Sequence, residues 1–284
     1  MRSLSRSKIR PIILSMVAPA AGFTLLFLLE MSLGVDFSRQ TKSLINLVLV
    51  AVIAFYVFPR WLGIPFGRVE TQDFLRRVGF YVPEDPWKHV LLGLVLAACT
   101  LSGMMVASIL SGGYVLDPST ISFQHLLFSL NPALWEELFY RGVLMVWLLR
   151  LGQPLRRAFL TQLALFGVMH VKGFGLLDLV DIFSVTVIAV GFTYAAYKTG
   201  SLLTGVVFHY FHDALLYFVQ VPGAELAGLT DNAVFFGCTW LMVGVGVRRH
   251  QAFRREAGRA CKRGAIFSLR RRIIAIHGIG LRSR

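Results

Sequence analysis

Long apolar segments recur along this chain, and they limit its possible folds more than any other feature. The hydrocarbon core of a bilayer is about 30 Å thick, so about 20 residues of α-helix cross it. Eight segments fit that length: 11–35, 43–59, 89–111, 123–149, 155–173, 178–197, 201–221 and 231–247. We therefore expect an all-α, polytopic membrane helical bundle of about eight transmembrane helices.

The composition excludes two other classes of protein. The 284 residues are 56% hydrophobic and only 15% charged, whereas about a quarter of the residues in a soluble globular domain are charged. Only three cysteines occur, which is too few for a disulfide-built secreted scaffold or a four-cysteine zinc site. An integral membrane protein is the class that remains.

The net charge of +14 is concentrated at the two ends of the chain. Residues 1–10 hold four basic residues and no acid, and residues 248–284 hold twelve basic residues and the single acid Glu256. With eight spans and a cytoplasmic N-terminus, 25 of the 29 Lys and Arg residues fall on the inner side and three on the outer side, as the positive-inside rule requires. We expect both termini to be cytoplasmic and the protein to lie in the inner (cytoplasmic) membrane of a bacterium.

These charges also divide the chain into a transmembrane helical domain, residues 1–247, and a basic cytoplasmic tail, residues 248–284. We expect the tail to contact anionic lipid headgroups and not nucleic acid. The polar segment 60–88 predicts a cytoplasmic loop with a short amphipathic piece that contains Phe74, Val78 and Tyr81. Residues 18–20 also resemble a signal-peptide cleavage site, but the apolar run continues past them, which favours a membrane span.

Several ionisable residues lie inside the predicted spans, where a charged side chain is costly and needs a partner or a function. They are Glu136, Glu137 and Arg141 in 123–149, His170 in 155–173, and His209 and Asp213 in 201–221. At 1.5 Å per helical residue, the acids and histidines of all three spans lie about 14–20 Å from the cytoplasmic ends of their helices. We therefore expect these residues to meet around one pocket within the membrane.

Helical spacing assigns these residues to faces. Glu137 precedes Arg141 by four residues, which favours an ion pair between them, and Glu136, about 100° further round the helix, is left to face the cavity. His209 and Asp213 share a face, whereas His212 is expected to point partly away. Phe166 lies one turn before His170 and is expected to shape the pocket.

A buried carboxylate beside histidines can hold a water molecule and accept its proton. At bilayer depth, the substrate that best matches such a site is an amide bond in a membrane-associated peptide. A structural origin is the alternative for any single member of the set, since one Glu–Arg pair can simply join two turns of a helix. Glu30, alone in the first span, is expected to be a packing or cavity group.

The order of these motifs resembles that of the CPBP intramembrane proteases, which include the type II CAAX-prenyl endopeptidases and the Abi-like bacteriocin-immunity proteins. The matching residues are Glu136-Glu137-x-x-x-Arg141, Phe166-x-x-x-His170 and His209-x-x-x-Asp213, preceded by Thr199-Gly200-Ser201-Leu202-Leu203. The resemblance covers about residues 122–221, the expected catalytic core. The motifs of rhomboid-like, aspartyl and site-2 zinc intramembrane proteases are absent from the sequence.

The resemblance implies a role for each matching residue. Glu136 would activate the attacking water with the help of His170, His209 and Asp213 would polarise the scissile carbonyl or stabilise the oxyanion, and Glu137 and Arg141 would support Glu136. The third motif of the family often ends in Asn. Here it ends in Asp213, and an ionised Asp cannot donate a hydrogen bond to an oxyanion. Asp213 would therefore be protonated, orient His209 or bind a metal.

A metal ion is an alternative to metal-free catalysis. Glu136, His170, His209 and Asp213 are acceptable zinc ligands by type, but they lack the compact spacing of the common zinc proteases. We expect a glutamate-activated water without a cofactor, with zinc as the alternative. A non-catalytic immunity or scaffold protein and an ion-coupled transporter are the rival functions, and the absence of an internal repeat argues against the transporter.

Overall fold

The described part of the chain is helical. The computed structural model describes residues 25–26, 28–61, 68–111, 115–150, 152–171, 175–220, 237–248 and 251. Within these ranges, the strands β1 (Val115–Leu116) and β2 (Val219–Gln220) form one short antiparallel pair. The predicted all-α class is confirmed. The alternative cleavage site at 18–20 and nearly all of the basic tail lie outside the described residues.

Among the described residues, each predicted span from 43–59 to 201–221 contains a helix, and residues 237–248 of the last predicted span are helical as well. The elements are α2 (Arg39–Val52), η1 (Ile53–Val57), α3 (Phe58–Trp61), α4 (Arg68–Arg77), α5 (Pro86–Ser111), η2 (Pro118–Thr120), α6 (Phe123–Glu136), η3 (Glu137–Val146), α7 (Trp147–Arg150), α8 (Leu155–Val168), α9 (Leu176–Thr199) and α10 (Leu203–Leu216). Of these, η1 and η3 are π-helical and η2 is a 3₁₀ turn.

Two of the described helical segments, Pro86–Leu110 and Ile182–Thr199, are long and apolar enough to cross a membrane. Large apolar side chains on α5 also face outward: Leu91, Ile109 and Leu110 are all more than 60% exposed. Large apolar side chains that are exposed along a helix of this length suit a lipid environment. The eight-span topology and the cytoplasmic termini stay predictions.

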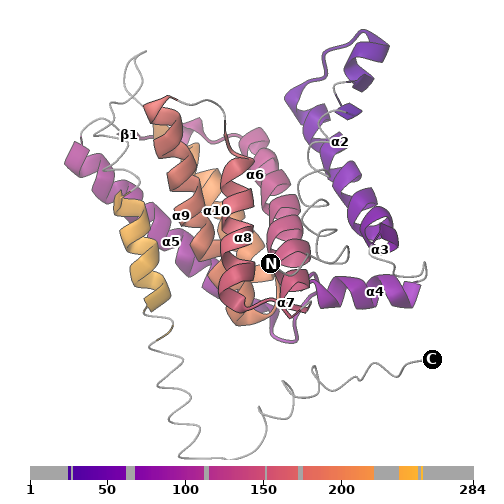
Figure 1. Cartoon of the computed structure of the whole chain (residues 1–284). Helices are drawn as coiled ribbons and strands as arrows, with labels where there is room; N and C mark the ends of the chain where they lie inside the picture. The colour runs from indigo at the N-terminus through magenta and orange to yellow at the C-terminus, as the bar shows by residue number, and fades with distance from the viewer. Residues whose placement is uncertain are drawn as a thin grey trace, which may run out of the picture.

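Helix α10 lies at the centre of the bundle. It packs against α5, α6 and α9, while α8 packs against α9 and η3. Figure 1 shows α8, α9 and α10 side by side, with α6 next to them and α2 to one side. Helix α2 packs against α6, and there the side-chain amide of Asn46 donates a 2.9 Å hydrogen bond to that of Asn131. This arrangement brings the three motif-bearing helices α6, α8 and α10 into one core.

The predicted amphipathic piece in 60–88 forms α4, which extends sideways from the lower end of the bundle in Figure 1. Phe74 and Val78 are almost completely buried in the core, and only Tyr81 is exposed among the three residues expected at the surface. Two of these side chains thus anchor α4 to the protein. The backbone N–H of Leu202 donates a 2.8 Å hydrogen bond to the carbonyl of Gly79, so the turn after α4 also holds the start of α10.

The β1–β2 pair joins the opposite ends of α6 and α10. The backbone N–H of Asp117 donates a 2.8 Å hydrogen bond to the carbonyl of Phe218, and the Thr120 hydroxyl donates to the carbonyl of Tyr217. The ring of His125, in the first turn of α6, stacks on the Tyr217 ring with 4.1 Å between centroids. The start of α6 and the end of α10 are therefore tied together by backbone and ring contacts.

Glu30, near the start of the described residues, is a polar packing group. Its carboxylate accepts a 2.9 Å hydrogen bond from the backbone N–H of Phe37 and lies 2.9 Å from the ammonium group of Lys42. Lys42 also contacts Asp36 at 2.9 Å. Glu30 is therefore part of a local ion-pair cluster.

Candidate functional site

A change of helix type separates the two acids of the first motif. The α-helical hydrogen bonding of α6 ends at Glu136, and the π-helical stretch η3 begins at Glu137. A π-helix pairs residues five apart instead of four, which widens the helix locally, and such widenings occur frequently at functional sites. The two neighbouring carboxylates thus lie at a local irregularity of the backbone, where Glu137 pairs with Arg141 and Glu136 lines a cavity.

Glu137 and Arg141 form a completely buried ion pair behind the cavity. A guanidinium nitrogen of Arg141 lies 3.2 Å from Oε1 of Glu137, and both side chains have no exposed surface. The guanidinium group also lies over the ring of Phe166, 4.2 Å from its centroid. The predicted pairing of these two residues is therefore present in the structure.

His209 links this ion pair to the cavity. Helix α9 ends at Gly200, whose left-handed φ of +71° stops the helix, and α10 then carries His209 into the core. Its Nδ1 lies 2.9 Å from Oε1 of Glu137, a hydrogen bond in which the ring N–H donates to the carboxylate. The imidazole stacks on Phe192 with 4.3 Å between ring centroids and 14° between planes. Both contacts fix the ring, so Nε2 points at the remaining acids.

Gly205, one turn before His209, gives Glu137 the room that it needs. A Cβ atom at this position would lie 2.6 Å from Oε2 of Glu137, and that carboxylate is already held by its buried partners. We expect the variant G205A to displace Glu137 and to lower peptide cleavage by about tenfold or more, since small misplacements of catalytic groups are costly. The measurement is kcat/KM of purified protein.

The control for this variant is G244A. Gly244 is also helical, but an added Cβ meets nothing within 4 Å, and Ala is the better helix former. G244A is therefore expected to match the wild type. Equal activity of G205A and G244A would contradict the steric argument.

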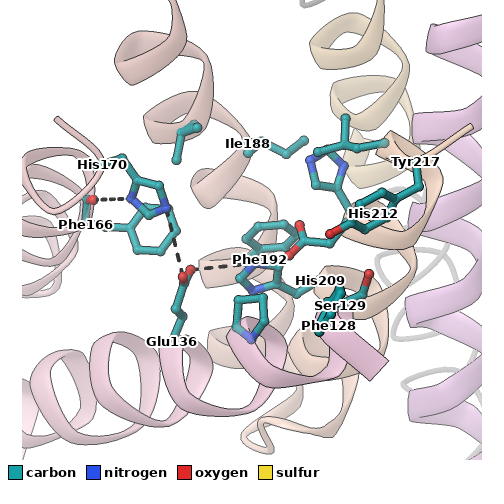
Figure 2. A pocket seen from close by; sticks show the side chains of 14 residues that line it. Phe128, Ser129, Glu136, Phe166, His170, Ile188, Phe192, His209, His212 and Tyr217 are labelled. Carbon is teal, nitrogen blue, oxygen red and sulfur yellow. Dashed lines mark hydrogen bonds and ion pairs between the residues drawn. The ribbon is translucent and has the colours of Figure 1, made fainter. Parts of the chain in front are cut away.

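Glu136 and His170 face each other across one side of the cavity (Figure 2). Nδ1 of His170 lies 2.8 Å from the carbonyl oxygen of Phe166. Because a carbonyl only accepts, this nitrogen carries the proton and donates. In the neutral ring, Nε2 then presents its lone pair toward Glu136, whose Oε1 lies 4.0 Å away. A water molecule that bridges these two acceptors would donate one hydrogen bond to each.

Asp213 closes the other side of the cluster. Its Oδ2 lies 3.5 Å from Nε2 of His209, and Oε2 of Glu136 lies 3.7 Å from the same nitrogen. Two carboxylates thus lie near Nε2 of His209, and a third carboxylate, Glu137, lies at its Nδ1. When both of its nitrogens are protonated, this imidazole compensates the surrounding negative charge.

These residues open onto a cavity of about 400 Å³. Its lining combines a polar floor with apolar walls: Phe128, Ser129, Pro132, Glu136, Phe166, His170, Val185, Ile188, Phe192, His209, His212, Asp213, Leu216 and Tyr217. The structure therefore brings Glu136, His170, His209 and Asp213 to one cavity, with Glu137 and Arg141 behind it. Phe166 lines the wall, as expected from its position one turn before His170.

The prediction made for His212 from helical spacing was wrong. It was expected to point partly away from the cluster, but its buried ring lines the same cavity. His212 follows His209 by three residues, and residues three apart are neighbours on a helix. That spacing is the sequence signal that points to the cavity.

Within the described residues, no group of three or more His, Cys, Asp or Glu side chains is arranged to hold a metal ion. The four alternative zinc ligands, Glu136, His170, His209 and Asp213, share the cavity, but they do not form such a set.

Comparison with known proteins identifies the middle of the chain. Residues 118–215 match the family model described as type II CAAX prenyl endopeptidase Rce1-like. All three motifs lie within this range, which starts four residues before the expected core at 122–221 and ends six residues before its end. Proteins of this family are intramembrane proteases. No curated protein and no solved structure matches the chain. The predicted resemblance to the CPBP family is thus confirmed over residues 118–215, which are similar to the Rce1-like family.

Proposed function

We propose that this protein is an intramembrane endopeptidase that hydrolyses a peptide bond of a membrane-associated substrate with a water activated by Glu136. The observation that carries the proposal is the meeting of Glu136, His170 and His209 at one cavity, with the Glu137–Arg141 pair buried behind it. The Rce1-like match favours a substrate of the prenylated CAAX type.

The reaction begins at the water between Glu136 and His170. The water donates hydrogen bonds to the Glu136 carboxylate and to Nε2 of His170, which leaves an oxygen lone pair free to attack the scissile carbonyl carbon. As the C–O bond forms, Glu136 takes a proton from the water and the carbonyl electron pair moves to oxygen. When the C–N bond breaks, the same proton passes to the leaving amine.

The Glu137–Arg141 pair and Asp213 position the reacting groups. Glu137 accepts the Nδ1 hydrogen bond of His209, and Arg141 offsets the buried charge of Glu137. We propose that Asp213 orients His209 through its Nε2 side, because an ionised carboxylate has no proton to offer a developing oxyanion. His209, when protonated at Nε2, places a positive charge near the site where this oxyanion develops.

The charge distribution of the whole chain supports a location and an orientation in the membrane. We propose a multi-pass protein of the inner membrane, with the basic segments on the cytoplasmic side and the tail 248–284 against anionic headgroups. A membrane-associated peptide or protein, and not nucleic acid, is the proposed partner.

The test is cleavage of an internally quenched, farnesylated CAAX peptide by protein purified in detergent. We expect cleavage, whereas failure to cleave both this peptide and its unprenylated form would contradict an endopeptidase of this substrate class.

The same assay tests the role of a metal. We expect cleavage to persist after chelation has removed all zinc, as verified by elemental analysis, because in the proposed mechanism Glu136 and His170 activate the water without a metal. Activity that is lost on zinc removal and restored by added zinc would contradict the metal-free mechanism and leave the endopeptidase assignment intact.

A further inference from the structure

His212 is a buried polar residue of the cavity that the proposed mechanism does not use. Only 9% of its surface is exposed, and it lines the cavity beside Asp213. Its ring meets the rings of Phe192 and Phe208 edge-on, with centroids 5.7 and 6.3 Å away. Figure 2 shows it among the labelled side chains around the cavity, together with His209 and Tyr217. Burying a polar imidazole among aromatic rings costs free energy unless its nitrogens find hydrogen-bond partners.

The two ring nitrogens of His212 differ in their surroundings. Nδ1 is buried from solvent and, within the described part of the chain, has no hydrogen-bond partner. Nε2 is not among the buried unpaired atoms, so it is the nitrogen that reaches the cavity surface. The proton of a neutral imidazole sits on one nitrogen only. A buried N–H without an acceptor is rarer in proteins than a buried acceptor without a donor, so Nε2 carries the proton and Nδ1 is bare.

This tautomer turns His212 into a hydrogen-bond donor that faces the substrate cavity. Its neighbour Asp213, when ionised, has no proton to donate, and His209 is shared with the carboxylates of Glu136 and Glu137. An oxyanion that develops at the scissile carbonyl needs donors aimed at it. Among the described cavity residues, His212 offers such a donor without a competing acidic partner.

We propose that the Nε2–H group of His212 donates a hydrogen bond to the scissile carbonyl oxygen and stabilises the oxyanion that forms there. The inference rests on the proposed endopeptidase function. His212 keeps its proton throughout, since the proton that reaches the leaving amine comes from the attacking water by way of Glu136. The hydrogen bond strengthens as charge builds on the oxygen, so its loss lowers kcat more than it changes KM.

Three substitutions separate the two nitrogens. The side-chain amide nitrogen of Gln reaches the position of Nε2, that of Asn reaches only the position of Nδ1, and Phe keeps the ring shape without a donor. We expect H212Q to keep kcat within about tenfold of the wild type, and H212N and H212F to lower it by about 100-fold, the loss typical of one oxyanion donor. Thermal unfolding in detergent controls for damage to the fold.

Each result of these measurements either supports or overturns the proposed role of His212. Full activity of H212F, or an active H212N beside an inactive H212Q, overturns the proposal. If all three variants unfold early, the tautomer decides instead: ¹⁵N spectra of histidine-labelled wild-type protein are expected to show a protonated Nε2 and a bare Nδ1 for His212.

The signal of His212 is assigned in the wild type through the His–Asp pair that it forms with Asp213, which occurs once in the sequence, and a protonated Nδ1 would overturn the proposal. A wild-type protein that cleaves no peptide overturns the proposed function and this inference with it. An active wild type with the opposite tautomer overturns this inference alone.

Discussion

The variant E136Q is expected to lower kcat/KM for peptide cleavage by about 10⁴-fold, the upper range for the loss of a general base. Gln has nearly the shape of Glu but cannot accept the proton of the attacking water. The carboxylate oxygens of Glu136 lie 4.0 Å from His170 and 3.7 Å from His209, so this acid approaches both imidazoles of the cavity. The measurement is cleavage of the quenched peptide by matched amounts of folded protein.

The matched control is E70Q. Glu70 lies on the exposed side of α4, far along the chain from the motifs, and the same change of charge there is expected to leave cleavage unaltered. Activity of E136Q within tenfold of the wild type would show that another group activates the water.

The same variant separates the rival functions in cells. A comparison of membrane proteomes with and without E136Q is expected to reveal an unprocessed substrate. An unchanged proteome together with unchanged biological protection would favour a scaffold or immunity protein, and altered uptake would favour a transporter.

The variant R141M is expected to destabilise the fold by about 3–5 kcal/mol, the usual cost of leaving one member of a buried ion pair without its partner. Both side chains of the pair are completely buried, 3.2 Å apart. Met fills much of the volume of Arg, so the loss reports mainly on the stranded carboxylate of Glu137. Thermal or denaturant unfolding in detergent measures the effect.

A double variant tests this explanation. E137Q combined with R141M removes both charges and is expected to recover most of the lost stability, although not activity, because His209 then lacks its carboxylate acceptor. The control R156M removes an exposed Arg of α8 and is expected to change stability little. A double variant no more stable than R141M would contradict the charge argument.

The sequence predicted the parts of the site that follow from regular helix geometry and from the cost of buried charge. Glu137 and Arg141 pair because four residues make about one helical turn. His170 and His209 meet Glu136 because ionisable groups in apolar helices must find one another. Neither inference needed the details of side-chain packing.

The other features of the fold and the site depend on local backbone irregularities and on tertiary contacts. The periodicity of apolar residues does not reveal either of these. The change from α- to π-helical bonding between Glu136 and Glu137 leaves no apolar pattern to detect. His212 lies in the cavity because α10 packs against α5, α6 and α9, and the sequence does not show which neighbours each face of this helix meets. Phe74 and Val78 are buried because α4 folds back onto the bundle, a tertiary contact that the amphipathic pattern could not distinguish from contact with lipid.

The pairing of β1 with β2 helps to fix the distance between the site residues on α6 and those on α10. Its backbone hydrogen bond from Asp117 to Phe218, together with the His125–Tyr217 stack, joins the start of α6 to the end of α10. The main acid and the main imidazole of the site stand on these two helices. Their spacing is therefore preorganised by the scaffold, and no reorganisation energy is needed to align them when a substrate arrives.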